Sequence, residues 1–457
     1  MPLVAGVDSS TQSTKVELRD LESGELVASG KAPHPAAEPP RSEQDPRAWW
    51  DALVAAMAAC GDARGDVVAV SVAGQQHGLV VLGQDHQPLR PAKLWNDTES
   101  APQSEALVEA LGAEVWSAAT GSVPVPSFTI TKLAWVVEHE PDIIPAIARV
   151  MLPHDYLTFR LSGEHVTDRG DASGGGWLDR ATGEYRDDLL ALAGGRDDWR
   201  SLLPRVLGPI EAAGTITTAA AAALGLPGDV VVGPGTGDNM GAALGLGLQS
   251  GDVAMSLGTS GTVYAVSPTP TADPSGAVAG FCDATGSYLP LVCTLNATKV
   301  TDTVARWLGL DASAFAALAL DAPLGANGVG LTPYFDGERT PNLPDATGTF
   351  AGLRNTTTAA DLARAAHEGV VDGLLHGLDA LRRAGADLRG TLTLIGGGSR
   401  SAAYRAIVAT RVGADIRVPD DDETVATGAA VQAARVVRGA LGTSDWELGA
   451  GTVVAPG

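Results

Sequence analysis

The residues best suited to chemistry follow a short apolar run near the middle of the chain. Gly233-Pro234-Gly235-Thr236-Gly237-Asp238-Asn239 comes directly after Asp229–Val232, which is predicted to be a buried strand. A carboxylate at the end of such a strand, in a glycine-rich loop that opens a helix, is well placed to abstract a proton. The glycines let a ligand approach the backbone closely. The plainer interpretation is that Asp238 caps the helix predicted over Asn239–Leu246, and both roles can hold at once.

Two predicted hairpins have tips of small hydroxyl residues and glycine. Val4–Ser9 leads into the tip Ser10-Thr11-Gln12-Ser13, and Val253–Leu257 leads into the tip Gly258-Thr259-Ser260. Backbone N–H groups and hydroxyls in such turns can hold a phosphate without a lysine, although ordinary turns use the same residues. Asp8 could also hold Mg²⁺ at the first tip, or only cap the turn. Neither tip has the spacing of a P-loop.

Three further loops follow predicted strands or turns. Gly74-Gln75-Gln76-His77-Gly78 offers amide and imidazole groups to a polyhydroxylated substrate, although a lone His is more often structural. Leu94-Trp95-Asn96-Asp97 suits a sugar ring or chain, and its alternative is a buried Trp followed by a turn. Ile395-Gly396-Gly397-Gly398-Ser399-Arg400 closes a strand and opens a helix, which suits a nucleotide. Its spacing is not that of a dinucleotide-binding fold.

Strand-like runs alternate with helical patterns along the whole chain, which is typical of an α/β protein. Val67–Ala73 and Thr391–Ile395 are predicted strands; helices are predicted from Pro46 to a stop at Gly61 and over about 361–383. Because the two hairpins lie about 250 positions apart, we expect two domains of similar architecture. With a boundary near Gly241–Ser250, the predicted domains are residues 1–243 and 244–457.

Composition excludes several classes of function. The 457 residues include 31 Lys+Arg and 54 Asp+Glu, for a formal net charge of −23. Nucleic acid and acidic membranes are therefore not expected as partners, because both bind clustered basic residues. We find no basic leader and no apolar run long enough to span a bilayer. Cys60, Cys282 and Cys293 lack disulfide or zinc spacing. These features predict a cytoplasmic protein.

With these segments in view, the chain resembles the FGGY carbohydrate kinases and, within them, those that phosphorylate xylulose. The resemblance covers nearly the whole chain. It rests on Arg41–Pro46 with Trp49-Trp50, on the Gln75-Gln76-His77 and Trp95-Asn96-Asp97 segments, on Phe128–Pro141 and Gly348–Glu368, and on Ser256–Gly261 with Gly396–Gly398. The first hairpin departs from the DxGT usual in the family: it is Asp8-Ser9-Ser10-Thr11, with a serine in place of the glycine. Gln76 stands where many bacterial xylulose kinases have Met.

The resemblance implies two ribonuclease H-like domains of the actin/hexokinase type around a deep catalytic cleft. It implies that the N-terminal domain binds the sugar and carries the catalytic base, Asp238, and that the C-terminal domain binds ATP. Asp8 lies near the phosphates and, with Asp238, near Mg²⁺. The residues expected to contact the sugar are Gln76, His77, Trp95, Asp238 and Asn239. Those expected to contact ATP are Ser10, Thr11, Gln12, Ser13, Lys15, Gly258, Thr259, Ser260, Gly397, Gly398 and Ser399.

The implied reaction is transfer of the γ-phosphoryl group of ATP to the 5-hydroxyl of D-xylulose, as in xylose catabolism. The alternatives are another FGGY kinase, acting on ribulose, fuculose, gluconate or glycerol, and a non-catalytic actin-like nucleotide switch. A homodimer is the commonest state for a protein of this kind.

Overall fold

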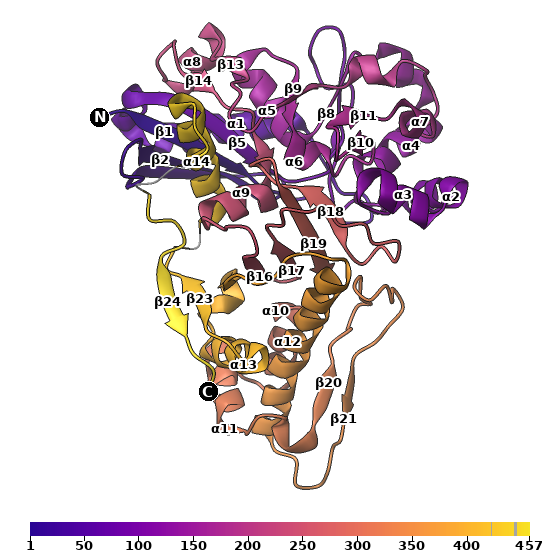
Figure 1. Cartoon of the computed structure of the whole chain (residues 1–457), viewed down its shortest axis with the longest axis vertical. Helices are drawn as coiled ribbons and strands as arrows, with labels where there is room; N and C mark the ends of the chain where they lie inside the picture. Colours follow the sequence, from indigo (N-terminus) through magenta and orange to yellow (C-terminus); the bar gives the residue numbers. More distant parts are fainter. Residues whose placement is uncertain (422, 443–445) are drawn as a thin grey trace.

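Each half of the chain builds a mixed seven-stranded β-sheet, and the two sheets share one plan (Figure 1). The computed structural model describes residues 1–421, 423–442 and 446–457. The first sheet comprises β13 (Gly214–Thr215), β14 (Val231–Val232), β5 (Val67–Gly74), β1 (Leu3–Ser9), β2 (Ser13–Asp20) and β3 (Leu26–Pro33) in this order, with β15 (Thr236–Gly237) paired to β5. The second comprises β18 (Ala279–Cys282), β19 (Tyr288–Thr294), β17 (Gly261–Ala265), β16 (Val253–Leu257), β22 (Leu392–Ile395), β23 (Ile416–Pro419) and β24 (Gly451–Val454).

The two hairpins occupy the same place in their sheets. The β1–β2 hairpin continues antiparallel into β3, while β1 pairs in parallel with β5, and β5 with β14. The β16–β17 hairpin continues antiparallel into β19, while β16 pairs in parallel with β22, and β22 with β23. The expected duplication is therefore visible in the strand order. The strands that are parallel to their neighbours read as almost unbroken apolar runs because both of their faces are covered.

Helices cover both sheets. In the first half they are α1 (Pro46–Ala59), α2 (Ala101–Leu111), α3 (Ala113–Thr120), α4 (Thr129–His139), α5 (Pro153–Ser162), α6 (Arg169–Ala172), α7 (Asp187–Ala191), α8 (Thr218–Leu224) and α9 (Asp238–Gly245). In the second half they are α10 (Thr298–Trp307), α11 (Ala312–Asp321), α12 (Ala359–Arg383), α13 (Ala402–Val412) and α14 (Thr424–Arg438). The predicted start of α1 is confirmed: the Asp45 side chain accepts a hydrogen bond from the N–H of Arg47, and Pro46 opens the helix.

Helix α14 lies on the first sheet, although it follows the strands of the second (Figure 1). Its Ala430, Val431 and Ala434 share a core cluster with Val4 and Ala69. The approach is so close that a Cβ atom at three glycines would overlap backbone atoms of the neighbouring element. These are Gly6 of β1, Gly245 of α9 and Gly428 of α14. The domain ranges 1–243 and 244–457 stay a prediction, and α14 falls in the second range while it packs on the first sheet.

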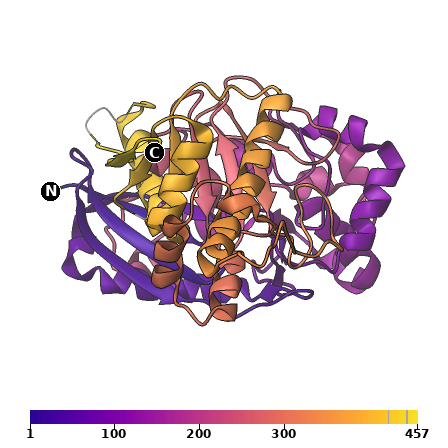
Figure 2. The ribbon, with the colours of Figure 1, turned by 90° about the horizontal axis from the view of Figure 1, so that it is seen from below.

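Two segments extend from this double-sheet frame. Residues 79–203 carry α2, α3 and α4 with a separate apolar core that includes Trp116, Leu133 and Trp199. Figures 1 and 2 place these purple helices at the opposite side of the molecule from the N-terminal strands. Strands β20 (Gly330–Thr332) and β21 (Thr349–Ala351) pair within a long arm on the second half (Figure 1).

Short strand pairs complete the described fold. They are β4 (Glu43–Gln44) with β7 (Ala92–Lys93), β6 (Val80–Leu82) with β8 (Arg149–Met151), β9 (Val166–Asp168) with β12 (Arg205–Leu207), and β10 (Leu178–Asp179) with β11 (Glu184–Tyr185). Among the described residues, no single helix has the length and apolarity needed to cross a bilayer. Only the α10 and α11 segments pass that test together, and an 88° bend separates them.

The close contact between α9 and α14 gives a direct prediction about stability. A Cβ at Gly428 would overlap the carbonyl oxygen of Gly241, so Gly428→Ala should lower the free energy of unfolding by about 1–3 kcal/mol. A Cβ added at Gly373, in α12, would meet no atom within 4 Å. Gly373→Ala is the matched control and should raise stability by about 0.5–1 kcal/mol, because alanine favours helix. Urea unfolding measures both, and a Gly428→Ala protein as stable as wild type would contradict the observed packing.

Candidate active site

The loops predicted to carry chemistry meet because their strands are parallel neighbours. β1, β5 and β15 end side by side: Ser9 pairs with Gly74, and Gly237 pairs with Gly74 as well. The residues that follow these ends are Ser10, Gln75 and Asp238. In open sheets of this kind, ligands bind outside the carboxyl ends of the parallel strands. The first sheet thus gathers three separate sequence motifs at one edge.

The second sheet likewise brings two motifs together at one edge, the tip of its hairpin and the glycine loop. β16 pairs in parallel with β22, so the tip at Gly258 and the loop at Gly396 leave neighbouring strands. A Cβ at Gly396 or Gly398 would crowd Leu257 at the end of β16. Gly396 also has a φ of +84°, which favours glycine. These glycines are therefore needed for the loop to lie against the hairpin.

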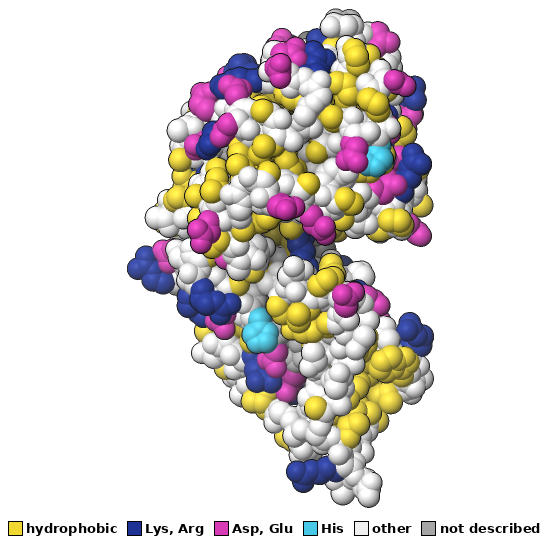
Figure 3. Space-filling model, turned by 90° about the vertical axis from the view of Figure 1, so that its right-hand side faces the viewer, with side chains coloured by type: hydrophobic (Ala, Val, Ile, Leu, Met, Phe, Trp, Pro, Cys, Tyr) yellow, Lys and Arg dark blue, Asp and Glu magenta, His cyan; other side chains and the backbone are white. Residues whose placement is uncertain are grey.

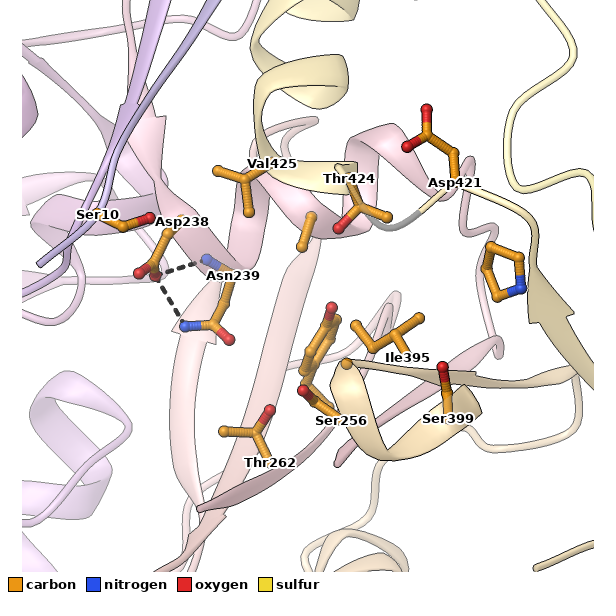
Figure 4. A pocket seen from close by; sticks show the side chains of 14 residues that line it. Ser10, Asp238, Asn239, Ser256, Thr262, Ile395, Ser399, Asp421, Thr424 and Val425 are labelled. Atoms are coloured by element: carbon orange, nitrogen blue, oxygen red, sulfur yellow. Dashed lines mark hydrogen bonds between the residues drawn. The ribbon is translucent and has the colours of Figure 1, made fainter. Parts of the chain in front are cut away.

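Two cavities lie between the halves of the chain, where the surface is hollowed (Figure 3), and they share part of their walls. The first, about 240 Å³, is shown in Figure 4. It is lined by Ser10, Asp238, Asn239, Ala242, Ser256, Thr262, Tyr264, Ile395, Gly396, Ser399, Pro419, Asp421, Thr424 and Val425. The second, about 270 Å³, is lined by Thr11, Gln76, His77, Trp95, Ser127, Asp238, Asn239, Ser260, Gly261, Thr262, Phe281, Leu291, Cys293, Thr294, Leu295 and Arg339.

All five residues predicted to contact a sugar line the second cavity. The Asn239 side chain donates from Nδ2 to Oε1 of Gln76 at 2.7 Å, which ties two of them together. Trp95 is 39% exposed, so the alternative of a buried tryptophan is wrong. Its Nε1 donates to Oγ1 of Thr11 at 2.9 Å. Amide, imidazole and indole groups thus surround a space of the size of a small sugar, and the role of each stays a prediction.

The residues predicted to contact ATP are placed less uniformly. Ser10 and Ser399 line the first cavity, whereas Thr11 and Ser260 line the second. The remaining seven line neither of these two cavities: Gln12, Ser13, Lys15, Gly258, Thr259, Gly397 and Gly398. Their positions on the tips and loop around the first cavity follow from the strand pairing described above.

Asp238 forms part of the wall that both cavities share. It is the first residue of α9, and Gly237 holds the capping position, so the alternative that Asp238 is the cap is wrong. Its Oδ1 accepts hydrogen bonds from N and Nδ2 of Asn239, at 2.8 and 2.9 Å (Figure 4). Burial raises the pKa of Asp238 to about 7, and the nearby Asp8 carboxylate adds to the rise. A carboxyl group with this pKa suits a general base at neutral pH.

Asp8 is almost fully buried beside the first hairpin tip. It accepts hydrogen bonds from Oγ of Ser10 and from Nζ of Lys15, the latter at 3.3 Å. Burial raises the pKa of Asp8, although Lys15 and Ser10 act in the opposite direction. Nζ of Lys15 also lies 2.8 Å from Glu423, so this ammonium group is held between two carboxylates. Asp8 therefore both supports the turn and places a carboxylate close to Asp238.

The Asp8–Asp238 pair has the donor chemistry of a magnesium site. The charge of Asp8 raises the proton affinity of Asp238, and a cation between the two carboxylates would relieve that repulsion. Carboxylates are the donors Mg²⁺ prefers, and the ion usually takes its other ligands from water and phosphate. A different acidic group, Glu43, Asp97 and Glu99, is compact enough to hold an ion. Nζ of Lys93 lies within 3.2 Å of all three, so an ammonium group is already held among these carboxylates.

His77 has the features of a constrained binding residue. Its φ is +63°, which is uncommon for a residue with a Cβ and recurs at functional sites. Its ring packs against Phe128 and Phe281, each at 5.1 Å between centroids. Burial lowers the pKa of His77 well below its usual value, and Lys132 and Arg339 lower it further. The imidazole is therefore neutral and can accept or donate a hydrogen bond.

Several cavity residues were missed by the sequence analysis. Arg339 and Phe281 line the second cavity, and Tyr264 and Thr424 line the first. Arg339 sits in a loop between Gly337 and Pro341, and that composition indicates a turn. Composition does not show that the loop reaches the sugar-side cavity. These residues reach the cavities only because the two halves of the chain lie against each other.

Comparisons with known proteins agree with this geometry. The N-terminal domain of the FGGY family of carbohydrate kinases matches residues 3–245, and its C-terminal domain matches residues 253–437. The chain belongs to the FGGY family of carbohydrate kinases. The predicted family and its two-domain actin/hexokinase-like fold are thus confirmed, and FGGY kinases use ATP as the phosphate donor.

Relatives within the FGGY family carry informative names. A xylulose kinase of Streptomyces coelicolor is 50% identical over 99% of this chain and 92% of its own length. The crystal structure of xylulose kinase from Bifidobacterium adolescentis has a TM-score of 0.90 and 43% identity, covering 100% of this chain and 96% of that one. Gluconate kinase from Lactobacillus acidophilus also has a TM-score of 0.90, at 25% identity, covering 100% and 94%. Overall shape therefore does not distinguish the sugar.

Proposed function

We propose that this FGGY kinase transfers the γ-phosphoryl group of ATP to the 5-hydroxyl of D-xylulose. Xylulose kinases that are 43–50% identical over nearly the whole chain support this substrate over the gluconate kinase at 25%. The observation that carries the proposal is the place of Asp238 in the wall shared by the two cavities. A base at that point can reach a sugar hydroxyl in one cavity while a nucleotide phosphate lies in the other.

In this proposal, Asp238 accepts the proton of the attacking hydroxyl. Gln76, His77 and Asn239 hold the sugar, so that this hydroxyl points toward the phosphate. Positioning of this kind provides much of the acceleration, because the transition state for phosphoryl transfer is loose and needs little covalent help. Asn239 donates hydrogen bonds to both Asp238 and Gln76, which holds the base in a fixed position relative to a residue that contacts the sugar.

The hairpin tips and the glycine loop bind the nucleotide in this scheme. Backbone N–H groups at Ser10–Ser13 and at Gly258-Thr259 stabilise charge that develops on the phosphate oxygens. In the same scheme, Gly397, Gly398 and Ser399 contact the adenosine. Magnesium held by Asp8 and Asp238 would neutralise phosphate charge when bound.

We further propose that the protein acts in the cytoplasm, that sugar and ATP are its partners rather than nucleic acid or a membrane, and that it forms a homodimer. The net charge of −23 supports the exclusion of polyanionic partners. In this proposal the first predicted domain, residues 1–243, binds most of the sugar, and the second, residues 244–457, binds most of the ATP.

Replacing the proposed base should stop transfer without harming the fold. Asp238→Asn should lower kcat for D-xylulose phosphorylation by about 10³-fold, because the amide cannot accept the proton. Its oxygen can still accept the bonds from Asn239, and one of two neighbouring carboxylates is removed, so the urea midpoint should not fall. Asp229→Asn, at an exposed position before β14, is the matched control and should match wild type. A normal kcat in Asp238→Asn would contradict the role of base.

A panel of sugars tests the substrate. With ATP and Mg²⁺, release of ADP should have its highest kcat/KM with D-xylulose among D-xylulose, D-ribulose, L-fuculose, gluconate and glycerol. The polar groups of the second cavity would be left unpaired by a sugar whose hydroxyls are arranged differently. A higher kcat/KM with another member of the panel would refute xylulose as substrate. ATP turnover that ignores every sugar would favour a nucleotide switch instead.

A further inference from the structure

Beneath the sugar-side cavity lies a buried cluster of one histidine and three carboxylates. Nε2 of His154, in α5, is 3.2 Å from Asp155, 3.3 Å from Asp168 and 3.5 Å from Asp171. The side chains of His154, Asp155 and Asp171 have no exposed area, and that of Asp168 is 6% exposed. None of the four lines either cavity, and none has a role in the function proposed above.

His154 packs against both loops that carry site residues, through its backbone and Cβ at Gly74 and through its ring at Gly235. A Cβ at Gly74, at the end of β5, or at Gly235, just before β15, would crowd this histidine. Asp168 is bonded to the second of these loops, because Oγ1 of Thr236 donates to its Oδ2 at 2.9 Å. Asp168 also accepts from the N–H groups of Gly170 and Asp171, which fixes it at the start of α6. The cluster is thus attached to the loop that leads into Asp238.

The cluster also faces His77. Oδ1 of Asp171 lies 4.0 Å from Nδ1 of His77. Both atoms are enclosed and have no hydrogen-bond partner. Unpaired buried polar atoms are costly, so two of them facing each other at this distance indicate a contact that a small movement completes. Hydrogen bonds in sites without ligand are often long and shorten on binding.

We propose that Asp171 is a positioning residue for sugar recognition: its carboxyl group forms a hydrogen bond with Nδ1 of His77 and leaves Nε2 of that ring for the sugar. The assignment of the sugar rests on the proposed function. One buried anchor, His154 with Asp168 and Asp171, then sets both the sugar-binding imidazole and, through Asp168 and Thr236, the loop of the proposed base.

Protonation states within the cluster agree with this contact. Burial lowers the pKa of His154, but its acidic neighbours, Asp155 and Asp168 foremost, outweigh burial and raise this pKa to about 9, so His154 carries a charge at neutral pH. Burial and the neighbouring Asp168, Asp155 and Asp238 raise the pKa of Asp171 well above its usual value, against the effect of His154. Asp171 can therefore hold a proton and donate it toward Nδ1 of the neutral His77, whose Nε2 then carries the ring N–H.

Two substitutions at residue 171 separate positioning from simple packing. Asp171→Leu keeps the branching of the side chain, with methyl groups in place of the two oxygens, and removes the hydrogen bond. It should raise the KM for D-xylulose by about tenfold, with the KM for ATP within about twofold of wild type. Asp171→Asn can still donate to Nδ1 and should restore most of the sugar affinity. Asp155→Asn removes a carboxylate that contacts the same His154 but does not face His77. It therefore shows how much stability the protein loses when the cluster loses a carboxylate and the contact with His77 is kept. Asp142→Asn, an exposed carboxyl, is the surface control.

Nitrogen NMR of the histidine rings tests the same contact in the wild-type protein, with the His77 signal assigned by its loss in His77→Gln. We expect one neutral tautomer, with the proton on Nε2 and a hydrogen bond at Nδ1. A mixture of tautomers, a proton on Nδ1, or an Asp171→Leu protein that folds and keeps its KM for D-xylulose would overturn the proposal. The NMR measurement needs no sugar, so it tests the Asp171–His77 contact even if D-xylulose is not the substrate. Failure of the proposed substrate would appear separately, as a wild-type enzyme that does not phosphorylate D-xylulose.

Discussion

The contact between α9 and α14 is the constraint on which the site depends. The two helices meet with backbone against backbone at Gly241, Gly245 and Gly428. Both begin at the hollow between the sheets: Asp238 opens α9, while Thr424 opens α14 and lines the same cavity. Glycines at the crossing leave little freedom for one helix to shift against the other. The proposed base and the nucleotide-side wall are therefore fixed relative to each other by residues that carry no chemistry.

Charge is handled locally in a strongly acidic protein. A net charge of −23 cannot attract ATP from a distance, since the long-range field has the wrong sign. Lys15, the lysine closest in sequence to a hairpin tip, is already held between Asp8 and Glu423. Compensation of phosphate charge is then left mainly to backbone N–H groups and a metal ion. Arg339 instead lines the sugar-side cavity, on a loop of the second half.

Sequence patterns predicted the parts of this fold that are local. Hairpin tips, the strand before His77 and the capped start of α1 each follow from a few adjacent residues, and the structure confirms them. The return of α14 to the first sheet was not predictable in this way. An alanine-rich helix has the same pattern whichever sheet it covers, and only the glycines it meets show which one is close.

Sequence patterns likewise predicted only the local parts of the site. The five sugar-side residues were found because each follows a strand end or turn with a recognisable composition. His154, Asp168 and Asp171 belong to helices and a strand whose sequence reads as ordinary structure, and they come together only through folding. Arg339 is separated from His77 by more than half the chain. The sequence analysis thus missed residues that only folding brings together, both within the first half of the chain and across the two halves.

The most direct measurement is a crystal structure with ADP, Mg²⁺ and D-xylulose bound together. The account predicts the sugar in the cavity with Gln76 and His77, and the nucleotide phosphates in the cavity with Ser10 and Ser399. The Asp238 carboxylate should then lie within about 2.6–3.2 Å of the 5-hydroxyl oxygen. Sugar and nucleotide in the same cavity, or a 5-hydroxyl turned away from Asp238, would contradict it.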